Sequence, residues 1–169
     1  MPTRGLHTSV KYLLSFPALV TLLGIALTIF MFRKKMTLLD RAKEIFSLAI
    51  INGFSDLHAT FVVSQAAHET NGFTSSVFKR ANNLFGMNYY VGQSFSVGKF
   101  GVYAVYANVE DSVLGFKDWT DRHVPILGFL SPRNTLSQWV RYLKVNNYFT
   151  DTEENYLKGC EYWHKKIWG

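Results

Sequence analysis

One carboxylate, Glu69, stands where an apolar stretch of the chain meets a signal that stops a helix. The run from Phe61 to Ala67 has the composition of a buried helix, and Asn71-Gly72 follows the carboxylate closely. An acid at the end of such a helix is partly desolvated, which raises its pKa and keeps it protonated near neutral pH. The negative end of the helix dipole acts in the same direction. These are the properties of a general acid.

A solvated glutamate at a frayed helix end is the simpler alternative from the residues alone, because most glutamates lie at the surface. A second segment, Asn82 to Met87, reads Asn-Asn-Leu-Phe-Gly-Met and has the composition of a loop that lines a groove. Tyr148 is a further candidate, although an aromatic side chain that covers the core beside Phe149 is an equally good interpretation.

Four segments, taken in order, resemble glycoside hydrolase family 73, the bacterial peptidoglycan N-acetylglucosaminidases. The resemblance extends from about residue 40 to residue 168. The matching segments are Ser64-Gln65-Ala66-Ala67-His68-Glu69-Thr70, then Asn82 to Met87, then Phe100 and Tyr103 followed by Glu110-Asp111, and last Tyr148-Phe149-Thr150-Asp151 followed by Tyr156. No single segment is specific, but the four together predict membership of this family.

The resemblance implies a role for each matched residue. Glu69 is expected to be the general acid, and Tyr148 is expected across the groove, where its hydroxyl positions the attacking water or the acetamido group of the substrate. The resemblance also implies substrate-binding roles for Gln65, Asn83, Phe85, Gly86 and Tyr103. The implied substrate is the glycan strand of peptidoglycan, and no metal or cofactor is expected.

One departure from the family bears on the mechanism. Many members carry a second glutamate before the Phe-x-x-Tyr element, whereas residues 87–106 of this chain contain no Asp or Glu. Glu110 is the nearest acid, but it begins a predicted helix, where stabilising the helix N-terminus is the simpler role. We therefore favour catalysis by one acid, with the substrate's acetamido group as nucleophile. The alternatives to a glucosaminidase are a lytic transglycosylase that acts on the same substrate and a catalytically weak wall-binding or structural membrane protein.

The predicted fold is α+β and mostly α, a lysozyme-like domain over residues 37–169 with a small β-hairpin lobe. Helix starts are expected at capping residues followed by apolar side chains at helical spacing. These caps are Thr37, Ser55, Ser75 or Ser76, Asn108, Thr135 and Thr152. Residues 87–106 are rich in Tyr, Val, Phe and Gly, which predicts two or three short strands with Gly92 and Gly98 as turn residues.

Residues 12–32 form an uncharged run of 21 residues, bounded by Lys11 and by Arg33-Lys34-Lys35. At 1.5 Å per residue a helix of this length spans roughly 30 Å, the thickness of a bilayer core. We expect a transmembrane helix here, after a basic tail at 1–11 and before a basic linker at 33–36. A cleaved signal peptide is the weaker alternative, because the run is long and ends without a small-residue cleavage site.

Most of the net positive charge of the chain lies in residues 1–35. Residues 1–35 hold five of the 18 lysines and arginines and none of the 12 acids, so the remainder is nearly neutral. A nucleic-acid-binding patch on the folded domain is therefore not expected. Cys160 is the single cysteine, which excludes an intramolecular disulfide and a thiolate metal site.

The predicted span leaves its orientation open. The basic cluster after it favours a cytoplasmic C-terminal domain, whereas a wall-degrading domain has to face outward. The conflict disappears if the membrane is the internal membrane of a lipid-containing virion. We therefore expect a single-pass membrane protein of the bacterial envelope or of such a virion, with the bilayer, and virion or envelope proteins, as partners.

Overall fold

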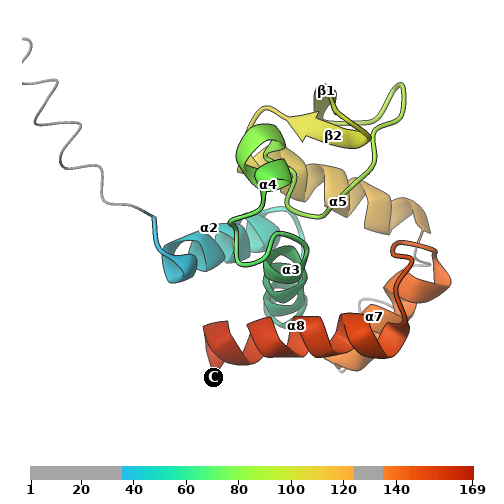
Figure 1. The fold of residues 1–169 in the computed structure, drawn as a ribbon. Helices are drawn as coiled ribbons and strands as arrows, with labels where there is room; N and C mark the ends of the chain where they lie inside the picture. The colour runs from blue at the N-terminus through green and yellow to red at the C-terminus, as the bar shows by residue number, and fades with distance from the viewer. Residues whose placement is uncertain (1–35, 124–134) are drawn as a thin grey trace, which may run out of the picture. The chain divides into compact units, whose positions relative to one another are not determined.

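A computed structural model describes residues 36–123 and 135–169 (Figure 1). The contacts within the chain separate two units, Met1–Met36 and Thr37–Gly169, and the second unit is described here. Within the described residues, none of the helices has both the length and the apolar character that crossing a membrane requires. The predicted span at 12–32 lies outside the described residues.

Six helices are described, and a capping residue precedes each of them. They are α2 (Leu38–Ile51), α3 (Asp56–Glu69), α4 (Ser76–Ala81), α5 (Val109–His123), α7 (Leu136–Val145) and α8 (Glu153–Trp168). The side chains of Thr37, Ser55, Ser75, Thr135 and Thr152 each accept a hydrogen bond from a backbone N–H of the first turn. Asn108 does the same for α5. The helix starts predicted from the sequence are confirmed.

The β lobe is an antiparallel hairpin of β1 (Ser96–Phe100) and β2 (Tyr103–Tyr106). The chain reverses at Gly101, whose φ is +63°, and an isolated bridge joins Asn88 to Tyr103 on the other side of β2. The prediction that Gly98 is a turn residue is wrong: it lies within β1, where an irregularity in pairing interrupts the register. Gly98 therefore accompanies an irregularity of the strand and not a reversal of the chain.

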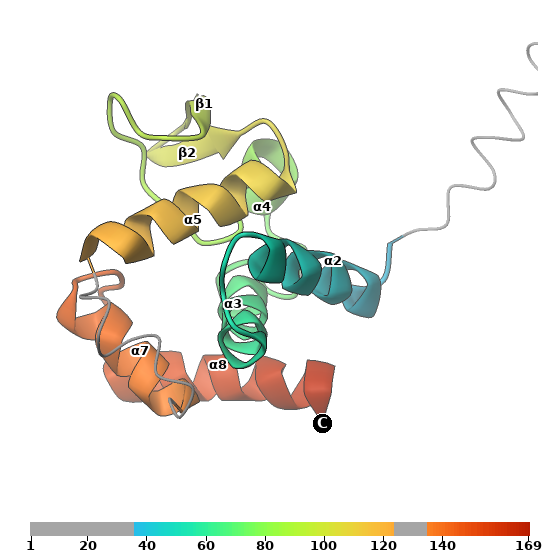
Figure 2. The ribbon, with the colours of Figure 1, turned by 180° about the vertical axis from the view of Figure 1, so that it is seen from behind.

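Helix α3 is the centre of the core. Nine of its residues, His58, Ala59 and Phe61–Ala67, are buried, and α3 packs against both α2 and α8. Figures 1 and 2 show α8 on one side of α3, with α4, α5 and the hairpin grouped on the other side. The last residue of this helix is Glu69.

Candidate active site

The carboxyl group of Glu69 lies at the C-terminus of α3 and is mostly buried. Its Oε1 accepts a hydrogen bond of 2.5 Å from the hydroxyl of Tyr156 in α8. Burial raises the pKa of Glu69 from 4.5 to about 6, and the Tyr156 hydrogen bond opposes part of that rise. The direction expected from the sequence is confirmed, and its main cause is desolvation.

The loop that follows α4 approaches the carboxyl group at Gly86. The φ of Gly86 is +62°, and a Cβ added there would meet Glu69 Oε2 at 2.9 Å. Asn83 fixes the loop: its Nδ2 donates to the carbonyls of Met87 and Ala104 at 2.8 and 2.9 Å, and its Oδ1 accepts from the N–H of Met87 at 3.0 Å. The sequence thus uses a buried amide and a glycine to bring backbone against the acid.

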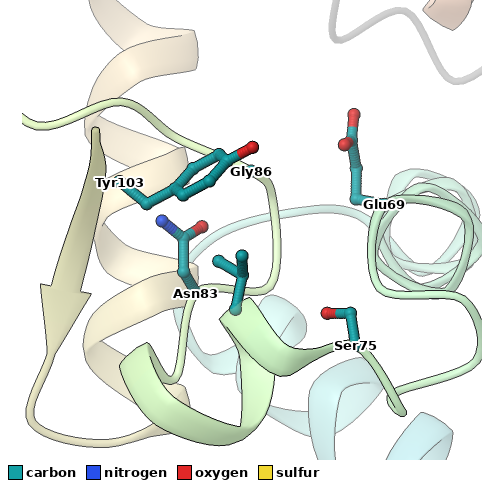
Figure 3. Close-up of a pocket in the computed structure, with 6 residues that line it drawn as sticks. Glu69, Ser75, Asn83, Gly86 and Tyr103 are labelled. Carbon is teal, nitrogen blue, oxygen red and sulfur yellow. The ribbon is translucent and has the colours of Figure 1, made fainter. Parts of the chain in front are cut away.

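A pocket of about 170 Å³ opens in front of Glu69. Figure 3 shows Glu69 on the α3 side and Tyr103 on the hairpin side, with Asn83 and Ser75 below them. The residues that line this pocket are Glu69, Ser75, Val77, Asn83, Gly86 and Tyr103. It therefore combines one acid with hydroxyl and amide groups, as a sugar subsite requires.

Tyr148 lies next to this loop rather than among the residues that line the pocket. Its hydroxyl donates to the carbonyl oxygen of Phe85 at 2.5 Å, and its ring makes edge contacts with Phe116 and Trp119. Burial, together with the nearby charge of Glu69, raises the pKa of Tyr148 well above 10. The hydroxyl is therefore a neutral donor at all working pH values.

Gln65 and Phe85, for which substrate binding was predicted, are fully buried and are not among the residues that line the pocket. Gln65 Oε1 accepts from the indole N–H of Trp139 at 2.9 Å, and its side chain also interacts with the hydroxyl of Tyr148. Phe85 stacks on Phe116 with ring centroids 4.2 Å apart. Both side chains therefore belong to the core next to the site.

The structure thus brings Glu69, Asn83, Gly86 and Tyr103 together around one pocket. Ser75 and Val77, which also line it, were not predicted as site residues. Ser75 was identified only as a helix cap, and Val77 carries no chemical signal. Tyr156 was matched to a family segment, but a contact across 87 positions cannot be found from local spacing.

Of the described residues that line this pocket, Glu69 is the one carboxylate. Glu110 lines a different hollow, together with Glu44 and Asn82. Within residues 36–123 and 135–169, no group of His, Cys, Asp and Glu side chains is arranged to hold a metal ion.

Comparisons with known proteins point to one family. The sequence model of the family Glucosaminidase, described as mannosyl-glycoprotein endo-beta-N-acetylglucosaminidase, matches residues 52–167. No curated protein is significantly similar to the chain.

Two solved structures are similar in fold. A chain of a type VI secretion system effector–immunity complex from Pseudomonas protegens has a TM-score of 0.58 at 14% identity, over 77% of this chain and 91% of that one. The catalytic domain of the autolysin Auto from Listeria monocytogenes has a TM-score of 0.51 at 15% identity, over 93% of this chain and 97% of that one.

Because the family match spans well over half of its length, the chain belongs to the Glucosaminidase family, glycoside hydrolase family 73, and is a peptidoglycan glycosidase.

Proposed function

We propose that the protein is an endo-β-N-acetylglucosaminidase that cleaves the glycan strand of peptidoglycan with Glu69 as its general acid. The observation that carries this proposal is the mostly buried Glu69 carboxyl, whose pKa of about 6 keeps a large share of it protonated near that pH. It faces a pocket of sugar-binding character, lined by Asn83 and Tyr103. A carboxyl with a raised pKa beside the leaving oxygen is what glycoside cleavage needs.

The proposed reaction uses one carboxyl group. Glu69 gives its proton to the glycosidic oxygen as the bond from that oxygen to C1 breaks. The carbonyl oxygen of the substrate's acetamido group then bonds to C1 in place of a protein nucleophile. Water, deprotonated by the Glu69 carboxylate, opens this cyclic intermediate and restores both the acetamido group and the acid. The absence of Asp and Glu from residues 87–106 supports this route over a two-carboxylate one.

Tyr148 is the second residue that we propose to act in catalysis, by positioning the water or the acetamido group. Its hydroxyl already donates to the Phe85 carbonyl, so toward the substrate it acts as an acceptor. The N–H of an acetamido group is a donor of the matching kind. Tyr103 is proposed to bind the same sugar from the hairpin side.

A lytic transglycosylase is the second candidate, because such enzymes also use one acid and form an anhydro sugar without water. The pocket's single carboxylate among the described residues agrees with either reaction.

We further propose that residues 12–32 anchor the enzyme in a membrane, either in the bacterial envelope or within a virion whose entry requires wall lysis. The length of the uncharged run and its basic flanks support this assignment. Anchoring would concentrate the enzyme at the wall. Recovery of the full chain in a washed membrane fraction, and its loss from that fraction when residues 12–32 are deleted, would support the anchor; recovery of both forms as free protein would oppose it.

The reaction is tested by digesting purified peptidoglycan with the full chain and reading the products by mass spectrometry. Reducing N-acetylglucosamine ends are expected. Anhydro ends, lighter by one water, would assign a transglycosylase, and reducing N-acetylmuramic acid ends would assign the other glycosidic bond. No soluble product would favour a wall-binding or structural role.

A further inference from the structure

The two oxygens of the Glu69 carboxyl have different surroundings. Oε1 accepts the hydrogen bond from Tyr156, whereas Oε2 lies beside Gly86, 2.9 Å from the place that a Cβ on Gly86 would take. Gly86 lines the pocket and Tyr156 does not. Oε1 is therefore the oxygen held by the protein, and Oε2 is the oxygen next to the substrate space.

We infer that Tyr156 is a positioning residue that assigns the catalytic proton to Oε2 of Glu69. An oxygen that accepts a hydrogen bond serves as the carbonyl oxygen of a protonated carboxyl, which leaves the proton on the other oxygen. The Tyr156 hydroxyl thus fixes both the rotation of the carboxyl group and the oxygen that donates. This inference rests on the proposed role of Glu69 as the general acid.

Tyr156 is itself held rigidly. It is 3% exposed, and its ring stacks on Phe149 with centroids 3.8 Å apart and planes 2° from parallel. The His68 ring makes an edge contact with the Tyr156 ring, with centroids 4.7 Å apart, and it fills the space that a side chain on Gly159 would need. A hydroxyl on a ring packed in this way has little freedom, so it restricts its acceptor to one geometry.

The neighbouring groups leave the hydroxyl as a donor. Burial and the nearby Glu69 charge raise the pKa of Tyr156 well above 10, so it remains protonated. Among the described residues, the other titratable groups near Glu69 are Tyr148, Cys160 and, across the pocket, Tyr103. Burial also raises the pKa of Tyr148 and of Cys160. His68 is adjacent, with a pKa lowered by burial and raised in part by Asp151. Of these groups, Tyr156 donates directly to the carboxyl.

The test compares the full chain with Tyr156→Phe, which keeps the ring and removes the hydroxyl. We expect kcat to fall about tenfold or more, because the carboxyl group is no longer oriented. We also expect the alkaline limb of the pH–rate profile to move up by about one unit, because the ionised form of Glu69 loses a stabilising hydrogen bond. Tyr162→Phe is the matched control: Tyr162 lies on the same helix, 57% exposed, and should change neither quantity.

If Tyr156 has a purely structural role, Tyr156→Phe should lower the Tm and the amount of active enzyme but leave the alkaline limb of the pH–rate profile at the same pH. That result would overturn the inference. If Tyr156→Phe does not fold, a neutron crystal structure of the wild-type chain below pH 6 decides instead: a deuteron on Oε2 of Glu69 is expected, and a deuteron on Oε1 would overturn the inference. Glu69→Gln separates the two proposals, because activity retained in that variant refutes the acid itself, whatever Tyr156 does.

Discussion

The two walls of the pocket are built differently. The helical wall is formed by the end of α3, and its Glu69 carboxyl is held by a buried hydrogen bond from Tyr156 of α8. The hairpin wall carries Tyr103 at the start of β2, and two nearby side chains, Val97 in β1 and Val102 in the turn, are about two-thirds exposed. Residues 87–106 bring no carboxylate to it.

This difference assigns the chemistry to the helical wall and substrate binding to the hairpin wall. A buried wall can shift the pKa of an acid because it excludes water, whereas an exposed hairpin without a carboxylate offers the substrate shape and hydrogen bonds. We therefore expect substitutions on the helical wall to lower kcat, and substitutions on the hairpin to raise KM.

The strongest test of this division is Glu69→Gln against Glu110→Gln. Removing the acid should lower kcat by about a thousandfold, since the leaving oxygen then receives no proton from the protein. Glu110 lies in a separate hollow at the start of α5, and its substitution should change kcat less than about twofold. Release of reducing ends from peptidoglycan measures both. Equal losses in the two variants would mean that two carboxylates share the reaction.

Next in size is the effect of Gly86→Ala, which places a methyl group 2.9 Å from Glu69 Oε2. We expect a loss of about tenfold to a hundredfold in kcat, because the donating oxygen is displaced. Gly92→Ala is the matched control, since it also has a positive φ, +81°, but has nothing within 4 Å of the added Cβ. Both variants should lose about 1 kcal/mol of stability. Similar activities for the two would contradict the close approach of loop and acid.

A third prediction concerns stability on the helical wall. Because folding raises the Glu69 pKa from 4.5 to about 6, the folded state disfavours the ionised form, and wild-type stability falls as pH rises through this window. Glu69→Gln removes that penalty. Relative to wild type, the free energy of unfolding of the variant should therefore increase by at most about 2 kcal/mol between pH 4 and pH 7. Denaturant titrations at several pH values measure it, and a constant difference would contradict the desolvation of Glu69.

The smallest effect is expected on the hairpin wall. Tyr103→Phe removes one hydroxyl from the pocket and should raise KM severalfold, with kcat within about twofold. Tyr89→Phe serves as the control, because Tyr89 lines a different hollow on the same lobe. A large fall in kcat for Tyr103→Phe would show that the hairpin takes part in the chemistry.

Local signals in the sequence were sufficient for much of the fold. The hydroxyl caps at Thr37 and Thr135 act on backbone groups three residues away, so their helices could be predicted from spacing alone. The prediction of a turn at Gly98 was wrong because glycine is compatible with both a turn and an irregularity within a strand. The two are distinguished only by the pairing across the hairpin.

The residues of the site were predictable in part. Its place at the end of an apolar helix made Glu69 a candidate acid, although a solvated glutamate was the simpler interpretation, and the family resemblance gave Glu69 its role and added Asn83, Gly86 and Tyr103. The hydrogen bonds from Tyr156 to Glu69 and from Trp139 to Gln65 depend on how α8 and α7 pack against α3. Such contacts span 74 to 87 positions and leave no local pattern.

The central claim is that one acid, titrating near pH 6, performs the chemistry. The most direct test is the pH dependence of kcat/KM on a soluble glycan fragment, over the range in which Tm shows the chain to be folded. The account predicts a profile that is flat at low pH and falls about tenfold per unit above pH 6, as Glu69 loses its proton. A bell-shaped profile, with an acidic limb from a second carboxylate that must be ionised, would contradict it.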